Sequence, residues 1–563
     1  MSAYSPAIRR ELRRLALEDN IVAPRGVYTR PTIQPAAFYV PYGVQFTWDV
    51  PYSGYAVLRT MPNGAELVRG FVENMLEVGQ VTEGPDTGML KRSVTYDGDQ
   101  AGQIGSQTPL LAWLAVQVHE QDPDPAFVAR VYPGLGACVD WWQGPRRDYD
   151  GDGLSEFAGT TPTYCVYESG HDYSPERDLA MSEPTPVSPD GLVHEPFADV
   201  FLNACLYAEL DALATLAAVC DPVRVAQWQR RRDALKARMN EAMWDEERGG
   251  FFPVIRRDLC PSQPRHYRHT PALLQPLWAG LATQEQADAT IAAVLQRPRT
   301  YPYGDGTMTV RLDPALYHGY QVVTDALHPS RGSGAAAGGV EVTEDGCVLR
   351  FAPDRGPAVA AFRRLVASVT VADLGADPYV EVDVVDGTGV RHQPIAGKPE
   401  ADGSAEGLLG IDAMAVSADP TWTPGLREIA VRARDCRITT LAIEYARMDR
   451  AGLLSAYGLK SAHPLDGKHP APGAPTDFWS GTIWGPHQLH AVQALRRYGY
   501  APLAEAVARA FCDCIVGAYA SGGDAFEHNS DLDGRGLGTV GYTWGAGVAL
   551  ALMQDVLGEP PLD

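Results

Sequence analysis

Helical periodicity occupies both ends of this chain and is absent from its middle. In the first part, leucines recur at helical spacing from Leu202 to Leu213, and Asp221-Pro222 predicts the start of the next helix. Towards the end, an apolar stripe leads to Gly499, a typical stop signal, before a further helix. Each pair of helices joined by a short turn predicts a helical hairpin, so a mainly α protein is expected.

The middle of the chain has the alternation of strands. Short β-branched runs occupy 340–343, 347–351, 366–371, 379–385, 429–431 and 438–445. Turn signals such as Asp386-Gly387-Thr388-Gly389 separate them, which is typical of a β-sandwich. We therefore expect a β-sandwich at 331–452, inserted between a first helical part at 1–330 and its completion at 453–563. The insertion could be a sugar-binding module, a wall of the site or a dimer contact, and its single Trp422 is weak support for the first.

Charge excludes several classes of partner. The 563 residues include 70 acidic and 47 basic ones, giving a net charge of -23, so nucleic acid and an anionic membrane surface would be repelled. Neither a secretory signal nor a bilayer-spanning run is expected from the pattern. The nine cysteines are scattered without ligand-like spacing, which fits reduced thiols in the cytoplasm.

Two carboxylate-bearing stretches, Glu168-Ser169-Gly170-His171-Asp172 and Phe526-Glu527-His528-Asn529, lie far apart in the sequence. Cleaving a glycosidic bond requires one carboxyl group that is protonated and one that is ionised. An acidic chain will also place carboxylates beside Gly and aromatic residues by chance, and a single such loop would carry little weight. The pair becomes informative through the motifs that accompany it.

Six motifs appear in the order found in glycoside hydrolase family 63 and its relatives, the trehalases and the mannosylglycerate and glucosylglycerate hydrolases. They are Phe46-Thr47-Trp48-Asp49, Ser106-Gln107-Thr108-Pro109, Asp140-Trp141-Trp142 with the loop that follows it, Glu168-Ser169-Gly170-His171-Asp172, Phe478-Trp479-Ser480-Gly481-Thr482-Ile483-Trp484 and Phe526-Glu527-His528-Asn529. The chain resembles that family over its helical part. The resemblance implies an (α/α)6 barrel and an inverting hydrolase with Asp172 as general acid and Glu527 as general base.

The same resemblance indicates the residues that would contact a sugar. They are Trp48, Asp49, Gln107, Gly170, His171, Trp479, Gly481, Trp484 and Trp544. Any single tryptophan is more often a core residue, but four beside carboxylates suggest a wall on which a sugar stacks, and at least two are expected to line the site. His171 is either an ordinary loop side chain or a contact to the leaving group.

Rival assignments stay open at this point. Glu168 could be the acid, with Asp172 paired to Arg177, and Asp524 or Asp531 could replace Glu527 as the base. Two departures from the family pattern lie beside the expected pocket. Ser480 stands where many relatives have Arg, and Pro175-Glu176-Arg177 is one residue longer than the familiar Pro-Arg. Both affect the identity of the sugar and of its partner group more than the reaction.

The loop Asp148-Tyr149-Asp150-Gly151-Asp152 places oxygen ligands at alternate positions, as in the first half of an EF-hand. Gly159 at the twelfth position excludes a true EF-hand. Two interpretations remain: a metal-free Asp/Gly turn, and a structural calcium site formed by Asp148, Asp150, Asp152 and Glu156. No cofactor is expected to be required for catalysis.

The resulting hypothesis is an inverting, exo-acting α-glycosidase acting on a small α-glucoside, α-mannoside or oligosaccharide in the cytoplasm, with assembly into a homo-oligomer left open. A trehalase-like hydrolase is the nearest alternative. A polysaccharide lyase on a helical toroid would instead give an unsaturated, absorbing product. A non-catalytic sugar-binding protein would bind without turnover.

Overall fold

The chain forms two compact units. The computed structural model describes 4–98, 105–172, 174–177, 186–255, 265, 270–296, 453–462, 479, 481–531 and 534–562, together with the strands and short connections of 299–449. One unit comprises 1–295, 453–461 and 482–563, and the other comprises 296–452 and 462–481. Tyr173, Trp422, Phe478 and Ser480 lie outside the described residues.

The first unit is built from helices. In chain order they are α1 Pro6–Ala16, α2 Asp49–Thr60, α3 Gly64–Gly79, α4 Leu111–Gln121, α5 Pro125–Trp142, α6 Pro162–Glu168, α8 Val200–Cys220, α9 Val225–Ala242, α10 Gln275–Ala279, α11 Gln284–Ile291, α12 Gly485–Arg497, α13 Ala501–Gly522 and α14 Thr543–Asp555. The hairpins predicted around Asp221-Pro222 and Gly499 are confirmed as α8–α9 and α12–α13.

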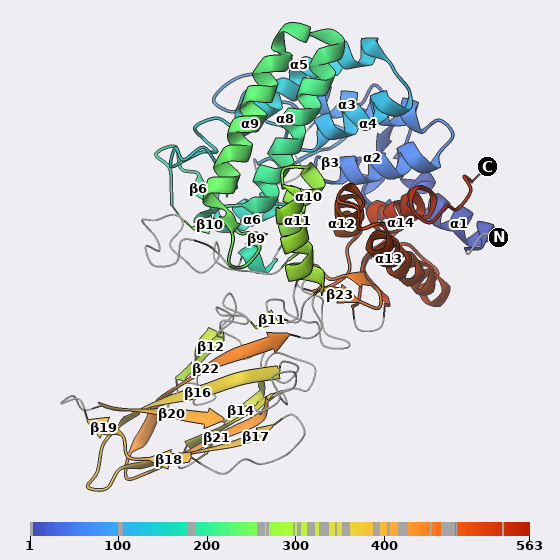
Figure 1. The fold of residues 1–563 in the computed structure, drawn as a ribbon. Helices are drawn as coiled ribbons and strands as arrows, with labels where there is room; N and C mark the ends of the chain where they lie inside the picture. The colour runs from blue at the N-terminus through green and yellow to red at the C-terminus, as the bar shows by residue number, and fades with distance from the viewer. Residues whose placement is uncertain are drawn as a thin grey trace. The chain divides into compact units, whose positions relative to one another are not determined.

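Six of these helices form a closed ring. Successive contacts join α2 to α4, α4 to α8, α8 to α10, α10 to α12, α12 to α14, and α14 back to α2 (Figure 1). The neighbouring helices α1, α3, α5, α9 and α13 each pack against a member of the ring. An inner ring with helices outside it is the arrangement of an (α/α)6 barrel.

Burial along the sequence explains which helix lies inside. In α14 every residue from Thr543 to Met553 is buried, and α8 is buried over most of its length. In α9 only Trp228, Leu235 and Met239 are buried, which is one stripe of an amphipathic helix. A helix that is apolar on all sides needs protein on all sides, so α8 and α14 belong to the ring and α9 packs outside it.

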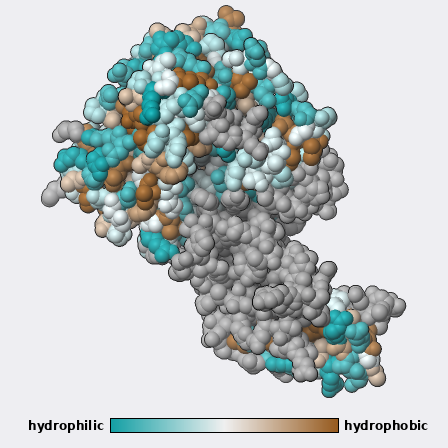
Figure 2. Space-filling view, turned by 180° about the vertical axis from the view of Figure 1, so that it is seen from behind, coloured by the Kyte–Doolittle hydropathy of each residue, from teal (hydrophilic) through white to brown (hydrophobic). Residues whose placement is uncertain are grey.

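Within the described part of the chain, one helix, α8, has the length and apolar composition of a membrane span. Of its most apolar window, 89% is buried inside the protein, as expected for a core helix of the ring. On the face of the molecule shown in Figure 2, apolar residues lie in several separate groups among hydrophilic ones.

Short two-stranded ribbons connect the helices of the first unit. They are β1 Ile21–Val22 with β2 Thr32–Ile33, β3 Gln45–Phe46 with β4 Ser93–Val94, β5 Ala158–Gly159 with β6 Val193–His194, β7 Phe197–Ala198 with β10 Val254–Ile255, β8 Trp244–Asp245 with β9 Gly250–Phe251, β23 Leu454–Ser455 with β24 Gly458–Leu459, and β25 Phe526–Asn529 with β26 Gly536–Val540. Two of them, β3–β4 and β25–β26, border the site described below.

The second unit contains two antiparallel sheets. The larger has the strand order β13-β12-β22-β16-β20-β19, with β11 also paired to β22, and the smaller has the order β14-β15-β21-β17-β18. The strands of the larger sheet are β11 Arg299–Thr300, β12 Gly306–Arg311, β13 Gln321–Asp325, β16 Ala361–Ala372, β19 Glu400–Ala401, β20 Glu406–Met414 and β22 Arg437–Asp449. Those of the smaller are β14 Ala337–Thr343, β15 Gly346–Phe351, β17 Tyr379–Asp386, β18 Ile395–Gly397 and β21 Leu426–Arg434. Strands β17 and β18 of the smaller sheet contact β20 of the larger one.

A buried carboxylate ties two ring helices together. Glu209 of α8 accepts hydrogen bonds from the backbone N–H groups of Ala112 (3.0 Å) and Trp113 (2.8 Å) at the start of α4. These N–H groups have no partner within their own helix, so an acceptor from a neighbour satisfies them. Burial raises the pKa of Glu209 to about 7, and the two N–H groups oppose that rise.

We predict that Glu209→Leu lowers the free energy of unfolding by about 2–4 kcal/mol, because two buried N–H groups lose their acceptor. Urea unfolding measures this change. The matched control is Asp211→Ala on the same helix, where an exposed ion pair with Arg232 is removed and a loss of about 0–1 kcal/mol is expected. Equal effects of the two substitutions would contradict the role given to Glu209.

Candidate active site

The Asp172 loop follows α6 and is held in place by its neighbours. Gly170 has a positive φ of 74°, and a Cβ there would lie 2.7 Å from the Trp48 indole, so only glycine fits. The Thr108 hydroxyl donates a hydrogen bond to the Ser169 carbonyl at 3.1 Å. The loop that carries Asp172 is therefore fixed against residues from two other motifs.

Glu527 projects from β25, which is anchored on both sides. The Glu527 carbonyl accepts a hydrogen bond from the Trp544 indole N–H at 2.9 Å, and the backbones of Ile483 and Asn529 exchange hydrogen bonds of 2.8 and 3.0 Å. The Glu527 side chain is buried, and its Oε2 accepts from the Thr539 backbone N–H at 3.0 Å. Strand pairing thus fixes where this carboxylate points.

The fold brings Asp172 and Glu527 into electrostatic contact. Burial raises the pKa of Asp172 to about 7, the charge of Arg92 opposes the rise, and the charge of Glu527 adds to it. Charges act on each other in this way only at short range, so two residues from distant parts of the sequence share one site. A carboxyl with a pKa near 7 can hold a proton at neutral pH.

Glu527 accepts a hydrogen bond that stabilises its charged form. Its pKa is raised by burial, but the hydrogen bond from the Thr539 N–H stabilises the charged form and opposes that rise. The two carboxyl groups thus differ in what opposes the rise of their pKa values: the charge of Arg92 at Asp172 and a hydrogen bond at Glu527.

Asp49, at the start of α2, is a third carboxyl in the site. The Tyr542 hydroxyl donates to its Oδ1 at 3.0 Å. Burial raises the pKa of Asp49 to about 8, the Tyr542 hydrogen bond opposes this, and the charges of Glu527 and Asp172 add to it. Three carboxyl groups therefore repel one another, and not all of them can be ionised at once at neutral pH.

The structure contradicts the pairing of Asp172 with Arg177 and gives Glu168 partners of its own. Glu168 is buried and accepts two hydrogen bonds from Arg147, at 2.7 and 2.8 Å, and others from the backbone N–H groups of Ser106 and Ala158. Arg177 pairs with Glu195 and Asp199. Glu168 thus has hydrogen-bond partners that hold it in the framework, and Arg177 is occupied by carboxylates other than Asp172.

Asp524, a rival for the role of base, closes a turn. Its Oδ1 accepts hydrogen bonds from the backbone N–H groups of Ala525 (2.8 Å) and Gly541 (2.9 Å). Asp524 therefore joins the start of β25 to the end of β26. Asp531 is half-buried in the loop after β25.

The four tryptophans are nearly inaccessible, with exposures of 1% for Trp48, 2% for Trp479, 0% for Trp484 and 3% for Trp544. The Trp48 backbone N–H donates to Gln107 Oε1 at 3.0 Å, and the Trp484 ring stacks on His528 at 4.5 Å. Such burial is typical of core residues, the more common fate of a tryptophan. Trp48, Trp484 and Trp544 support the loops around the carboxylates, and sugar stacking on them stays a prediction.

Gly481, another predicted sugar contact, has a positive φ of 121°.

His171 is packed into the interior. Its ring lies 5.3 Å from Trp48, 4.4 Å from Phe201 and 5.0 Å from His487, measured between ring centroids. Burial lowers the pKa of His171, and the neighbouring His487 lowers it further, so the ring is neutral. The His171 ring thus packs against aromatic side chains, and a contact between His171 and a leaving group stays a prediction.

Three residues of the site carry no sequence signal of their own. Arg92, just before β4, and Tyr39, in a turn before β3, both interact with the carboxyl groups, and Tyr542 binds Asp49. Tyr542 lies two residues before Trp544, one of the predicted sugar contacts, and so was within reach of motif reasoning. Arg92 and Tyr39 enter the site only through tertiary folding.

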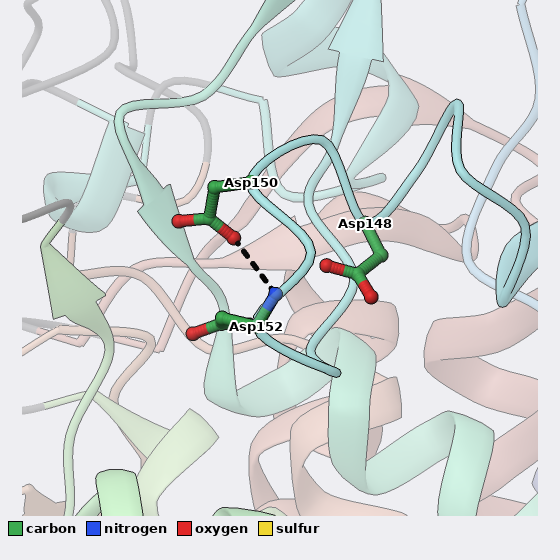
Figure 3. A group of neighbouring side chains, drawn as sticks. All are labelled: Asp148, Asp150 and Asp152. Carbon is green, nitrogen blue, oxygen red and sulfur yellow. Dashed lines mark hydrogen bonds between the residues drawn. The ribbon is translucent and has the colours of Figure 1, made fainter.

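The loop at 148–152 brings three carboxylates together (Figure 3). One oxygen from each of Asp148, Asp150 and Asp152 lies within 4.8 Å of the others. Burial raises the pKa of Asp148, and the charges of Asp152 and Asp150 raise it further. Glu156 is buried beside them, and its pKa is raised in the same way. The donor set consists of oxygens, the ligands that calcium prefers, and it fits such an ion.

Hydrogen bonds within this loop also satisfy part of the donor set. Asp150 and Asp152 accept from backbone N–H groups two residues ahead, at 3.3 and 2.8 Å. Arg238 of α9 binds Asp152 Oδ2 at 2.8 Å. A metal-free turn and a calcium loop share these features, so both interpretations remain.

Comparison with known proteins supports the resemblance. Residues 68–314 match the family model described as "Mannosylglycerate hydrolase MGH1-like glycoside hydrolase domain". Among curated proteins, a trehalase of Bombyx mori is 23% identical over 272 residues, which is 41% of this chain and 44% of that protein. The cytosolic neutral trehalase of Emericella nidulans is 29% identical over 141 residues, 24% of this chain and 18% of that protein. The chain thus matches less than half the length of these relatives.

Solved structures share the fold. The GH63 mannosylglycerate hydrolase from Thermus thermophilus in complex with glucose superposes with a TM-score of 0.52 at 18% identity, covering 97% of this chain and 100% of that one. Neutral trehalase Nth1 from Saccharomyces cerevisiae gives a TM-score of 0.50 at 14% identity, covering 97% of this chain and 79% of that one. At these identities the likeness establishes fold alone.

The helical ring, the order of the motifs and the match over 68–314 agree with one another. The expected (α/α)6 barrel is confirmed by its neighbours. The resemblance inferred from the motifs is confirmed: residues 68–314 match a glycoside hydrolase domain model of the mannosylglycerate hydrolase type, and part of the chain is similar in sequence to trehalases.

Proposed function

We propose that the chain hydrolyses an α-glycosidic bond with inversion, with Asp172 as general acid and Glu527 as general base. The observation that carries this proposal is the electrostatic contact between two buried carboxyl groups, of which Glu527 also accepts a backbone hydrogen bond that stabilises its charged form. The matched glycoside hydrolase domain supports it.

In this mechanism Asp172 protonates the glycosidic oxygen as the bond to the anomeric carbon breaks. Glu527 takes a proton from a water molecule that attacks from the opposite face of the sugar ring. Inversion requires carboxyl groups roughly 6.5–9.5 Å apart, so that the water fits between base and sugar. The raised pKa of Asp49 suits it to staying protonated and donating a hydrogen bond to a sugar hydroxyl, which would leave Glu527 as the ionised group.

The proposed substrate is a small α-glucoside or α-mannoside, cleaved from its non-reducing end. Mannosylglycerate hydrolase and trehalase are the activities named for the similar proteins. Trehalose is the second candidate, because the curated relatives are trehalases. We also propose a cytoplasmic location, in keeping with the cytosolic neutral trehalase among the relatives.

For the second unit, we propose that the two sheets pack face to face as a β-sandwich inserted in the helical chain. The contacts of β17 and β18 with β20 support this, since they join one sheet to the other. The boundary expected at 331 is moved, because β11, β12 and β13 belong to the larger sheet: the proposed division is a helical part at 1–295, the sandwich at 296–452 and the barrel completion at 453–563.

A structural calcium ion is proposed at Asp148, Asp150, Asp152 and Glu156. Crowded carboxylates repel one another unless a cation neutralises them, and the ion pair of Arg238 with Asp152 supplies one positive charge beside four acidic groups. The ion would stabilise the loop between α5 and α6, and catalysis would not use it.

Asp172→Asn and Glu527→Gln are each expected to reduce kcat by about a hundred- to ten-thousandfold, because each removes one proton-transfer group. Proton NMR of the first-formed sugar should show the inverted anomer with the wild-type enzyme. Near-normal turnover by either variant would remove that assignment.

The fold should survive the acid substitution. The pKa of Asp172 is about 7 in the folded chain against 3.8 for the free group, so its ionisation destabilises the folded state progressively as pH rises through that window. At about pH 8, above both values, Asp172→Asn should therefore melt at a higher temperature than the wild type. A lower melting temperature would indicate that lost activity reflects misfolding.

Arg92→Met should shift the pH dependence of kcat/KM. Arg92 holds down the pKa of Asp172, so removing its charge lets that pKa rise, and the loss of activity at high pH should begin at a higher pH. Arg92→Lys keeps the charge and serves as the control. An unchanged alkaline limb in Arg92→Met, or an equal shift in both variants, would contradict the role of Arg92.

Calcium should raise the melting temperature relative to EDTA, since an ion that binds only the folded state at about 100 times its Kd stabilises by about 2.7 kcal/mol. Asp150→Asn should lose this difference, and Asp140→Asn, an exposed carboxylate of α5, should keep it. Identical melting curves in calcium and EDTA would favour the metal-free turn.

A further inference from the structure

We propose that Phe38, Tyr42 and Val540 form a platform that binds the group attached to the glycosidic oxygen of the substrate. The ligand chemistry is a flat apolar face, either an aromatic ring or the C–H face of a second pyranose. This inference rests on the proposed hydrolase function and adds to it the class of leaving group.

The three side chains are unusually exposed for their type. Phe38 is 62% exposed, Tyr42 59% and Val540 48%, and they are among the few large apolar side chains found at the surface of the described residues. Aromatic residues normally bury their large apolar area. Exposed aromatic rings grouped together are more typical of a binding surface than of solvent-facing structure.

The segment that presents them is well anchored. The Thr543 N–H donates to the Pro35 carbonyl at 2.9 Å, Ala36 forms a β-bridge with Tyr542, and the Tyr96 hydroxyl donates to the Val40 carbonyl at 3.1 Å. Gly541, which precedes Tyr542, approaches Ala37 closely enough that a Cβ would lie 3.2 Å away. Phe38 directly follows Ala37 and Val540 directly precedes Gly541, so the same contacts bring them together.

An aromatic path connects this surface to the carboxyl groups. The Phe38 ring lies 5.1 Å from Tyr39 and 5.9 Å from Tyr42, and Tyr39 lies 5.5 Å from Phe46. Burial raises the pKa of Tyr39 to about 12, and the charges of Asp49, Glu527 and Asp172 raise it further. Ala36, three residues before Tyr39, forms a β-bridge with Tyr542, whose hydroxyl donates to Asp49, so the segment that carries Tyr39 lies beside the carboxyl groups and the exposed Phe38 ring lies next to Tyr39.

Position decides which part of the substrate these rings would meet. The sugar that is cleaved must lie between Asp172 and Glu527, where carboxyl groups and Tyr542 match its hydroxyls. An exposed apolar surface beside that place suits the group that leaves, because an exo-acting enzyme receives the terminal sugar in its interior. Apolar packing on an aromatic ring contributes affinity without requiring hydroxyls in fixed positions.

Three substrates that share the cleaved sugar and differ in the leaving group test this inference. They are the α-glycosyl fluoride, the 4-nitrophenyl α-glycoside and an α-linked disaccharide. Fluoride is too small to reach the platform. In Phe38→Ala and Tyr42→Ala, KM should rise about three- to tenfold for the nitrophenyl glycoside, the disaccharide or both. Kinetics on the fluoride should stay at the wild-type value. Val223→Ala, which trims a valine that is 90% exposed elsewhere, is the matched control and should change none of them.

An effect on the nitrophenyl glycoside alone would assign an aromatic leaving group, and an effect on the disaccharide as well would assign a sugar. Unchanged kinetics on both extended substrates, or an equal loss on all three, would overturn the platform while leaving the hydrolase function in place. Absence of turnover of the fluoride by the wild-type chain would overturn the hydrolase function itself, and the platform with it.

Discussion

The packing of α14 against α2 is the contact on which the site depends. It closes the ring of helices, and it places Asp49, at the start of α2, beside Tyr542, just before α14. The hydroxyls of Ser53 and Thr543 meet at 2.5 Å within this contact. Because β25 and β26 lead directly into α14, the same packing delivers Glu527 to the side of the ring where the Asp172 loop lies.

Burial and mutual repulsion then give each carboxyl its character. Asp49, Asp172 and Glu527 lose solvation together, and each makes ionisation of the others more costly. Local interactions make the three carboxyl groups different. Thr539 donates a hydrogen bond to Glu527, and the charge of Arg92 opposes the rise in the pKa of Asp172. Glu168, equally buried, is balanced by Arg147 and so belongs to the framework. Identical chemical groups acquire different roles from their surroundings.

Much of the fold could be read from the sequence because it is local. The hairpins α8–α9 and α12–α13 follow from apolar spacing and from signals such as Gly499, which depend on neighbours a few residues away. That Asp172 and Glu527 lie in one site could be inferred only from the order of the motifs. Apolar periodicity predicts helices and does not predict which distant residues come together.

Other features required the folded chain. Whether a tryptophan faces a ligand or the interior depends on what packs over it, so the burial of Trp48 and Trp484 could not be foreseen from composition. The interior position of His171 depends on Phe201 and His487, which come from two other helices. Arg92 and Tyr39 escaped notice because the residues around them repeat no pattern, and only long-range packing gives them a role.

Ring closure between the second helix and the last has a consequence for biosynthesis. Until residues 543–555 have left the ribosome, the faces of α2 and α12 that pack against α14 stay uncovered, although both helices have already been synthesised. Contacts between such distant segments form slowly, and exposed apolar surface invites aggregation in the meantime. The ring of helices would therefore stay open during most of the synthesis of the chain. In that period chaperone binding would matter more than for folds that assemble from consecutive segments.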